Sequence, residues 1–316
     1  MGVLDLYKNC RLCPRSCAIN RYEFKGYCGQ NARLKAVYVG LHFGEEPPIT
    51  GKNGSGTVFF SGCSLRCSFC QNYQISHMQI GREYTLESIC QSVLDMLITH
   101  SPHNINLVTF DHFIPHVISL VETLKANGID IPIVANVSGY QKRETLGLIK
   151  DCVDIYLPDF KYSDEDLAKA LSNARDYPEV ALNAISEMLK QKGTLKTCNV
   201  NGIEIAVRGV LVRHLILPGY TKNSLDALSM LYCEFGKDLA ISLMSQYYPI
   251  KHHDDPNLNR ILLGEEFEIV ISHARELGFT TLYFQYPEAN LGEIYLPDFT
   301  SEDPFSIKQY KRHCDK

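Results

Sequence analysis

The sequence lacks any apolar run long enough to cross a membrane, and it has no strongly basic stretch. A membrane helix needs about 20 consecutive apolar residues, so we expect no membrane association. The first eight residues have no long apolar core, which predicts no secretory signal and a cytoplasmic location. The 31 Lys and Arg against 36 Asp and Glu give a net charge of −5, so nucleic acid is not an expected partner.

Length and composition are ordinary for a globular protein. The chain has 316 residues, of which 45% are apolar and 21% charged. This is enough to bury a substantial core, and we expect one large domain with an appendage. No low-complexity tract and no repeat of 20 to 50 residues is evident.

Cysteine is unusually frequent and unevenly placed. Seven of the twelve cysteines precede position 71, and the others are scattered singly at Cys90, Cys152, Cys198, Cys233 and Cys314. A long chain without an export signal is a poor candidate for a disulfide framework. Metal ligation explains the concentration better, and the scattered thiols are typical of packing positions.

The most informative motif is C-x3-C-x2-C, formed by Cys63, Cys67 and Cys70. Three thiolates at this spacing can hold one corner of a cubane iron–sulfur cluster and leave the fourth iron without a protein ligand. A closed zinc site would need a fourth ligand nearby, but the next histidine, His77, lies seven residues beyond Cys70. The alternative is a chance group of buried, inert cysteines.

A second set of cysteines lies near the amino terminus with the pattern Cys10-x2-Cys13-x3-Cys17-x10-Cys28. Four sulfurs in nineteen residues are compatible with a second [4Fe–4S] cluster or with a closed structural zinc site. The spacing alone does not choose between them.

Short β-branched or aromatic runs alternate with amphipathic stretches after residue 53. The expected strands are 56–62, 105–110, 131–137, 154–160, 210–217, 239–245 and 280–285, and the expected helices are 85–99, 112–127, 141–151, 163–172, 178–192, 223–235 and 257–277. Residues 1–53 are turn-rich and too interrupted for long regular elements. We therefore expect an α/β fold with parallel strands, divided into a cysteine-rich segment (1–53), a barrel (54–288) and a carboxy-terminal extension (289–316).

The run from Gly54 through Ser76 resembles the cluster-binding segment of the radical S-adenosylmethionine (SAM) superfamily. More narrowly, it resembles a poorly characterised group named after pyruvate formate-lyase-activating enzyme. The similarity extends to the runs 41–47, 104–108, 154–161 and 213–218. It implies a partial (β/α)6 barrel with ligands at the carboxyl ends of the strands.

The resemblance implies a chemistry as well as a fold. SAM would chelate the open iron, and an electron from the reduced cluster would cleave it to a 5′-deoxyadenosyl radical that abstracts hydrogen. The expected electron donor is a protein such as flavodoxin or ferredoxin, and the substrate is either a small molecule or a protein that receives a glycyl radical. Characterised activators usually carry extra cluster cysteines after the radical SAM motif, whereas here they precede it.

The resemblance also suggests SAM contacts. Phe69 matches the position near the adenine, although it would serve equally as a loop anchor. The superfamily often has a glycine-rich turn after the second strand to receive the amino group of SAM. Here the stretch lacks glycine, and Thr109 or Asp111 is the expected acceptor.

Three further strand ends carry candidate SAM contacts. Asn136 and Ser138 suit a ribose or carboxylate contact, unless Ser138 simply caps a βα turn. Asp159 and Lys161 share one face of a strand and would bind a zwitterion, or else form a salt bridge with each other.

Arg213 is a plausible partner for the SAM carboxylate. It and His214 face opposite sides of their strand, and either could instead make only a structural hydrogen bond.

Two interpretations compete with a SAM-cleaving enzyme. The cysteines would hold zinc in a structural or regulatory protein, or the barrel would keep a cluster only as a redox sensor. His42, Glu45 and Glu46 resemble a family signature, but a solvated acidic turn would look the same.

Overall fold

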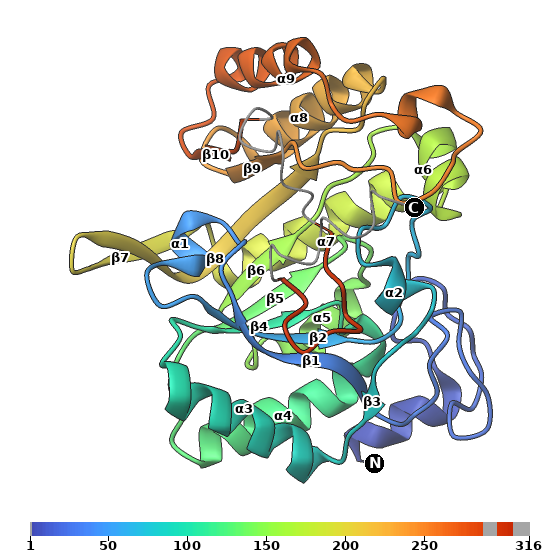
Figure 1. Cartoon of the computed structure of the whole chain (residues 1–316), viewed down its shortest axis with the longest axis vertical. Helices are drawn as coiled ribbons and strands as arrows, with labels where there is room; N and C mark the ends of the chain where they lie inside the picture. The colour runs from blue at the N-terminus through green and yellow to red at the C-terminus, as the bar shows by residue number, and fades with distance from the viewer. Residues whose placement is uncertain (1, 287–295, 306–316) are drawn as a thin grey trace.

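The computed structural model describes residues 2–286 and 296–305. Within them one ten-stranded sheet has the order β10-β9-β8-β6-β5-β4-β2-β1-β3, with β7 paired to β8 (Figure 1). Neighbouring strands are parallel from β2 to β10. They are β2 (Ser55–Phe60), β4 (Ile105–Val108), β5 (Ile133–Val137), β6 (Ile155–Pro158), β8 (Ile203–Leu215), β9 (Ala240–Met244) and β10 (Leu282–Phe284). The sheet ends at β10 and β3 and is not closed, which confirms the predicted α/β partial barrel.

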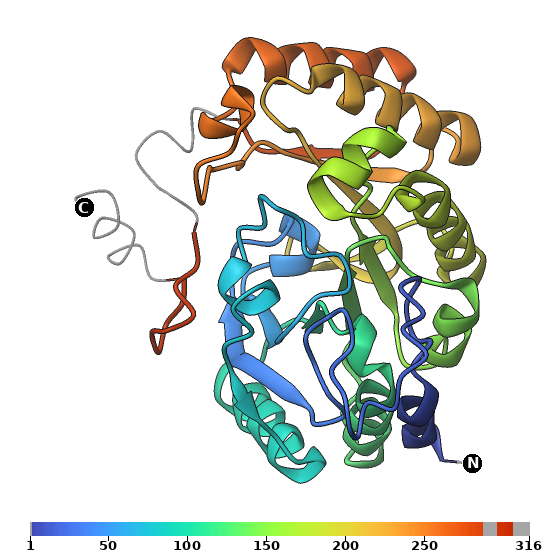
Figure 2. The ribbon, with the colours of Figure 1, turned by 90° about the vertical axis from the view of Figure 1, so that its right-hand side faces the viewer.

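Helices connect the parallel strands and cover the outside of the curved sheet (Figures 1 and 2). They are α3 (Leu86–His100), α4 (Ile114–Ala126), α5 (Arg143–Ile149), α6 (Glu165–Ser172), α7 (Tyr177–Lys192), α8 (Thr221–Phe235) and α9 (Gly264–Leu277). Thr85 begins α3 by accepting a hydrogen bond from the Ser88 amide, and Asp164 caps α6 through the Leu167 amide. Local capping therefore supports the alternation that the sequence predicts.

Some elements differ from the prediction. Residues 1–53 were expected to hold no long element, yet β1 (Lys35–His42) pairs antiparallel with β2, and with β3 (Arg82–Glu83) on its other side. The hairpin of β7 (Lys196–Val200) with β8 was not predicted, and α9 begins at Gly264, seven residues after the predicted start. Residues 35–42 form a strand because they pair with β2 and β3, and the local sequence pattern does not show this pairing.

Short helices complete the described residues. They are α1 (Pro47–Thr50), α2 (Tyr73–Ser76) and the 3-10 helices η1 (Val3–Asn9), η2 (Asp111–Phe113) and η3 (Pro256–Asn259). Ile49 of α1 packs inside the barrel with Val134 of β5 and Leu211 of β8. The segment between β1 and β2 thus fills part of the barrel interior and leads into β2.

Side chains alternate between the inside and the outside of the barrel. On β6, Ile155 and Leu157 face the small interior core, whereas Tyr156 joins the larger core beneath the helices. Asp159 continues the inward series because side chains two residues apart share one face of a strand. The same alternation directs Arg213 inward and His214 outward, where the His214 ring contacts the Phe160 carbonyl and the Ser224 hydroxyl.

A carboxy-terminal strap (residues 296–305) runs back along β1 and β2 (Figure 1). Phe299 is buried against Phe59 with ring centroids 5.2 Å apart. The Phe305 ring packs at a tilt against the His42 ring, with centroids 4.1 Å apart. The side-chain oxygen of Gln74 in α2 accepts a hydrogen bond from the Phe299 amide at 2.7 Å. The rest of the predicted extension, residues 289–295 and 306–316, lies outside the described residues.

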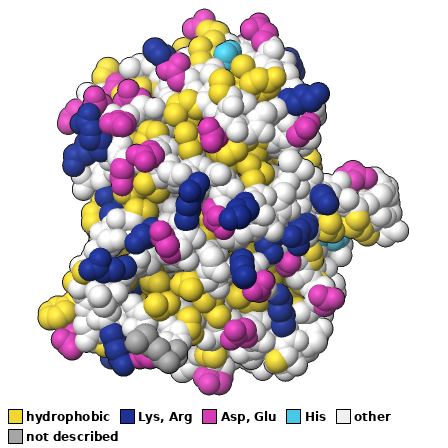
Figure 3. Space-filling model, turned by 180° about the vertical axis from the view of Figure 1, so that it is seen from behind, with side chains coloured by type: hydrophobic (Ala, Val, Ile, Leu, Met, Phe, Trp, Pro, Cys, Tyr) yellow, Lys and Arg dark blue, Asp and Glu magenta, His cyan; other side chains and the backbone are white. Residues whose placement is uncertain are grey.

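The described helices include none that is long and apolar enough to span a bilayer. On the face seen in Figure 3, basic and acidic side chains are interspersed, and apolar side chains lie in small groups between them.

The turn after β5 places a glycine where no side chain has room. Gly139 has φ +79°, and a Cβ there would lie 2.0 Å from the Asp159 carbonyl oxygen. We expect Gly139→Ala to lower the free energy of unfolding by about 2 kcal/mol or more, because it combines strain with a backbone clash. Urea denaturation followed by circular dichroism would measure this.

Gly147→Ala is the matched control. Gly147 lies in α5 with nothing within 4 Å of an added Cβ, so alanine should stabilise the protein by roughly 0.5–1 kcal/mol. Equal stability of both variants would contradict the packing described for the β5 turn.

Candidate functional site

A cavity of ≈ 1010 Å³ opens at the carboxyl ends of the parallel strands. Register explains its position, because Phe59, Val108, Asn136 and Leu157 are successive partners across β2, β4, β5 and β6. Residues that follow these strands therefore meet at one edge. Of the predicted site residues, the cavity is lined by Cys63, Cys67, Phe69, Cys70, Thr109, Asn136, Ser138, Asp159, Lys161 and Arg213.

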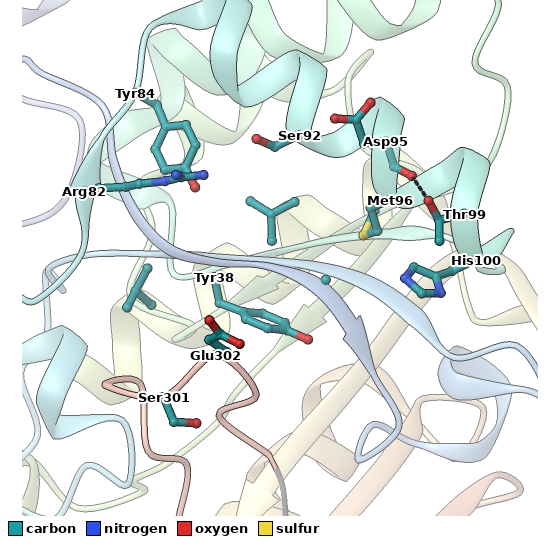
Figure 4. A pocket seen from close by; sticks show the side chains of 13 residues that line it. Tyr38, Arg82, Tyr84, Ser92, Asp95, Met96, Thr99, His100, Ser301 and Glu302 are labelled. Carbon is teal, nitrogen blue, oxygen red and sulfur yellow. Dashed lines mark hydrogen bonds between the residues drawn. The ribbon is translucent and has the colours of Figure 1, made fainter.

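A smaller hollow of ≈ 600 Å³ lies outside the barrel, between β1 and α3 (Figure 4). Its wall includes Tyr38, Arg82, Tyr84, Asp95 and His100, and it contains none of the predicted site residues. It is therefore not the candidate active site.

The barrel cysteines (Cys63, Cys67 and Cys70) follow β2 in a tight loop. Gly62 and Arg66 take positive φ values of 87° and 56°, which turn the chain around the sulfurs. The amides of Leu65 and Arg66 donate to Cys63 Sγ at 3.3 and 3.5 Å. Such N–H groups stabilise a thiolate and are typical of iron–sulfur ligation.

Burial disfavours the thiolate forms of Cys63 and Cys70. It raises the pKa of Cys70 to about 11, with the neighbouring Cys67 as the next cause, and it raises the pKa of Cys63 further. A bound metal centre would offset this by stabilising the thiolates. In the described part of the chain, no three His, Cys, Asp or Glu side chains gather tightly enough for a single metal ion. Sulfurs arranged around a cavity wall suit a cluster, which is larger than one ion.

Phe69 forms an apolar wall of the cavity. It is 5% exposed and packs against Tyr162 and Tyr247, with ring centroids 6.4 and 6.2 Å away. The aromatic contacts fix the ring beside the barrel cysteines, where it both anchors the loop and faces the cavity.

Arg213 sits in a buried network at the bottom of the cavity. Its Nη1 is 2.8 Å from Glu45 Oε2, and its Nη2 donates to Asn136 Oδ1 at 2.6 Å. Its Nε lies 3.4 Å from Asp159 Oδ1. The predicted SAM-carboxylate contact of Arg213 stays a prediction, and any ligand carboxylate there would share the guanidinium with these partners.

Glu45 and Glu46 were not among the predicted site residues, although they lie in a run that carries the family resemblance. Their side chains are only 5% and 7% exposed, so they do not form a solvated turn. Burial raises the pKa of Glu46, Arg213 opposes this, and Glu45 adds to it. Their burial beside a cation could not be read from the sequence, because an exposed acidic turn has the same composition.

Asp159 and Lys161 form an ion pair in the cavity wall, with Lys161 Nζ 2.5 Å from Asp159 Oδ2. Burial lowers the pKa of Lys161, but Asp159 and the Cys67 sulfur together raise it above its ordinary value. Lys161 therefore stays charged. The salt bridge offered as one alternative is present, and because both side chains line the cavity, their contact with a zwitterion stays a prediction.

The two predicted acceptors of the SAM amino group, Thr109 and Asp111, follow β4 but lie in different places. Thr109 lines the cavity with φ +58°, an unusual conformation for a β-branched residue, at the place where the superfamily often has glycine. Asp111 is buried behind the cavity wall, where its carboxylate accepts a hydrogen bond from Gln141 Nε2 at 2.6 Å. Burial raises the pKa of Asp111 to about 6. Thr109 is therefore the better-placed of the two.

Asn136 and Ser138 line the cavity after β5. Asn136 is engaged with Glu45 and Arg213, whereas the Ser138 hydroxyl accepts the Tyr140 amide at 3.4 Å. Ser138 thus supports the turn and faces the cavity at once.

The amino-terminal cysteines (Cys10, Cys13, Cys17 and Cys28) lie away from the cavity, behind the loop of the barrel cysteines. All but Cys17 are buried. A Cβ built on Gly26 would lie 3.5 Å from Cys28 Sγ and 3.7 Å from Cys17 Sγ, so these sulfurs are near neighbours. Burial raises the pKa of Cys13 to about 12, opposed by the Arg15 amide and reinforced by Cys28 and Cys10. The set has donor chemistry suited to a metal centre.

Comparisons with known proteins identify the family. The Radical SAM superfamily model matches residues 57–231. An uncharacterised protein of Methanocaldococcus jannaschii is 30% identical over 292 residues, covering 88% of this chain and 78% of that protein. A pyruvate formate-lyase-activating enzyme of Clostridium pasteurianum is 29% identical over 133 residues, covering 39% of this chain and 52% of that enzyme.

Solved structures resemble the chain only loosely. A domain of pyruvate-formate lyase-activating enzyme from Bacteroides vulgatus is 14% identical with a TM-score of 0.38, covering 54% of this chain and 92% of that one. Methylornithine synthase is 14% identical with a TM-score of 0.42, covering 79% and 77%. The sequence match over residues 57–231 spans more than half of the chain, and the chain belongs to the radical SAM superfamily.

Proposed function

We propose that the protein is an enzyme that reductively cleaves SAM to generate a 5′-deoxyadenosyl radical for hydrogen abstraction. The observation that carries the proposal is that the barrel cysteines line the same cavity as the charged pair Asp159–Lys161. Family membership implies a [4Fe–4S] cluster and SAM. When bound, these groups supply a one-electron cleavage of the sulfonium carbon–sulfur bond.

The chain's own residues would position SAM. The barrel cysteines would hold three irons, and the carboxylate of Asp159 and the ammonium of Lys161 suit the amino and carboxylate groups of a zwitterion. Phe69 offers an apolar face to the adenine, and Thr109, Asn136 and Ser138 offer hydrogen-bonding groups at the neighbouring strand ends. The Glu45–Arg213 pair would keep the bottom of the cavity rigid and dry.

The proposal extends to the amino-terminal segment, the electron donor and the cellular compartment. Residues 1–53 would form a second metal-binding segment beside the barrel of residues 54–288, holding an iron–sulfur cluster or zinc. A flavodoxin or ferredoxin would supply electrons. The described cysteines are all free, which suits a reducing cytoplasmic setting.

Activation of a glycyl-radical enzyme is a second candidate, favoured by the partial match to the Clostridium pasteurianum enzyme. Incubation with a candidate protein, SAM and reductant would then produce a glycyl radical visible by electron paramagnetic resonance. If labelled 5′-deoxyadenosine instead collects hydrogen from a small molecule, this candidate is excluded.

Removal of one barrel cysteine should abolish the activity. We expect Cys67→Ala to lose about 4 irons per chain after anaerobic reconstitution and all release of 5′-deoxyadenosine, because three sulfurs are needed to hold the cluster. Iron analysis and chromatography of the reaction would measure this. Cys90→Ala is the control, since Cys90 is a buried thiol of α3 outside the cavity and should keep both properties. A colourless, zinc-loaded wild-type protein would favour the structural interpretation.

Loss of the ammonium should weaken SAM binding without loss of the cluster. Lys161→Met removes a buried charge-assisted contact, so we expect a Kd for SAM higher by about 10 to 100-fold, measured by equilibrium dialysis. Iron content should stay unchanged. Lys222→Met, at an exposed surface position, serves as the control. Unchanged affinity in Lys161→Met would remove this residue from the proposed site.

A further inference from the structure

Arg21 is fully buried beside the amino-terminal cysteines. Its Nη1 donates to the His112 carbonyl, and its Nη2 donates to the Asn31 carbonyl at 2.5 Å. Its guanidinium carbon also lies 4.8 Å from the Tyr7 ring centroid. These neutral partners hold the side chain firmly in place but do not balance its charge.

No acidic side chain of the described residues forms an ion pair with Arg21. A guanidinium stays protonated in proteins, and an uncompensated buried charge is strongly unfavourable. Its Nε also finds no hydrogen-bond partner among the described residues, and its Nη1 lies 4.0 Å from Cys10 Sγ. A negative charge close to Arg21 would therefore stabilise it. The neighbouring groups that can carry this charge are the cysteine sulfurs.

Each of the amino-terminal cysteines has an N–H donor directed at its sulfur. Cys17 Sγ accepts the Tyr27 amide at 3.4 Å, and the amides of Arg15 and Gln30 donate to Cys13 and Cys28. With Arg21 beside Cys10, each of the four sulfurs has an N–H donor. Four thiolates around a centre of charge about +2 leave roughly −2 in total, which offsets the Arg21 charge.

The choice between zinc and a cluster follows from comparison with the barrel cysteines. Both sets are mostly buried and receive N–H donors. The amino-terminal cysteines thus have surroundings of the same kind as the barrel cysteines, for which family membership implies a [4Fe–4S] cluster, and we extend that assignment to them.

The two sets of cysteines are in backbone contact. A Cβ on Gly62 would lie 2.6 Å from the Cys28 carbonyl oxygen, and Gly62 directly precedes Cys63. Arg15 strengthens the contact, because its Nε donates to the Ser64 carbonyl at 2.9 Å. Figure 2 shows the amino-terminal segment lying beside the loop that follows β2. Electrons would have a short route through these atoms.

We propose that the amino-terminal cysteines hold a second [4Fe–4S] cluster, with Arg21 as its buried counter-ion, that relays electrons to the cluster of the barrel cysteines. The relay rests on the proposed function, because its acceptor is the barrel cluster. A low-potential protein of the flavodoxin or ferredoxin class loses one electron, the second cluster gains it and passes it on, and the barrel cluster is reduced by one electron. No bond is made or broken in this transfer.

Metal analysis of the full-length, anaerobically reconstituted protein tests the cluster. We expect about 8 irons and 8 sulfides per chain, about 4 of each in Cys13→Ala and in Cys67→Ala, and an unchanged content in Cys90→Ala. A wild-type content of about 4 irons with about 1 zinc that disappears in Cys13→Ala would overturn the second cluster.

The relay is tested by the rate at which the barrel cluster is reduced, followed by electron paramagnetic resonance. With reduced flavodoxin as donor, Cys13→Ala should slow this rate by about tenfold or more, whereas with the small reductant dithionite it should stay within about threefold. If the rate falls with flavodoxin but not with dithionite, the barrel cluster of the variant is still reducible, which shows that the variant is folded. Equal rates for wild type and variant with flavodoxin would overturn the relay.

Arg21 is tested by two substitutions. Arg21→Met should shift the reduction potential of the second cluster to a more negative value or lose that cluster, because a nearby cation stabilises the added electron. Arg21→Lys keeps the charge and should remain closer to wild type. Identical potentials in all three proteins would overturn the counter-ion role. If about 8 irons are found but SAM is not cleaved, the proposed function fails while the second cluster stands.

Discussion

The ion pair between Arg213 and Glu45 joins parts of the barrel that are distant in sequence. Through Asn136 and Asp159 the same guanidinium also reaches β5 and β6. A buried charge must keep its partners, so these contacts fix where the strands meet and how deep the cavity is. Glu45 comes from the loop between β1 and α1, so this network ties that loop to β5, β6 and β8.

Much of the architecture could be predicted from the sequence, because each parallel strand is a short β-branched run followed by a capped amphipathic helix. The alternation of side chains along a strand also predicted that Arg213 and His214 face opposite sides of β8. β1 and the β7 hairpin were missed, since their pairing depends on distant residues. The burial of Glu45 and the displacement of Asp111 behind the wall depend on three-dimensional packing, which no local pattern records.

The amino-terminal segment is as much a part of the active-site architecture as the barrel strands. Arg15 binds the carbonyls of the Cys63 loop and of Ser172 at the end of α6, and Arg21 reaches the start of α4 through His112. Two arginines thus fix the amino-terminal cysteines to the barrel. A metal centre in this segment would be positioned as firmly as the one in the cavity, which is what electron transfer between them requires.

The carboxy-terminal strap has a consequence for the size of molecule that the cavity admits. Pro297 and Phe305 contribute to the same wall as the barrel cysteines, and Gln74 holds the strap to α2, just after Cys70. The flank that the incomplete barrel leaves without a strand is therefore partly screened by the last described residues of the chain. A bulky polypeptide approaching along that flank would have to displace Pro297 and Phe305, whereas a compact metabolite would not.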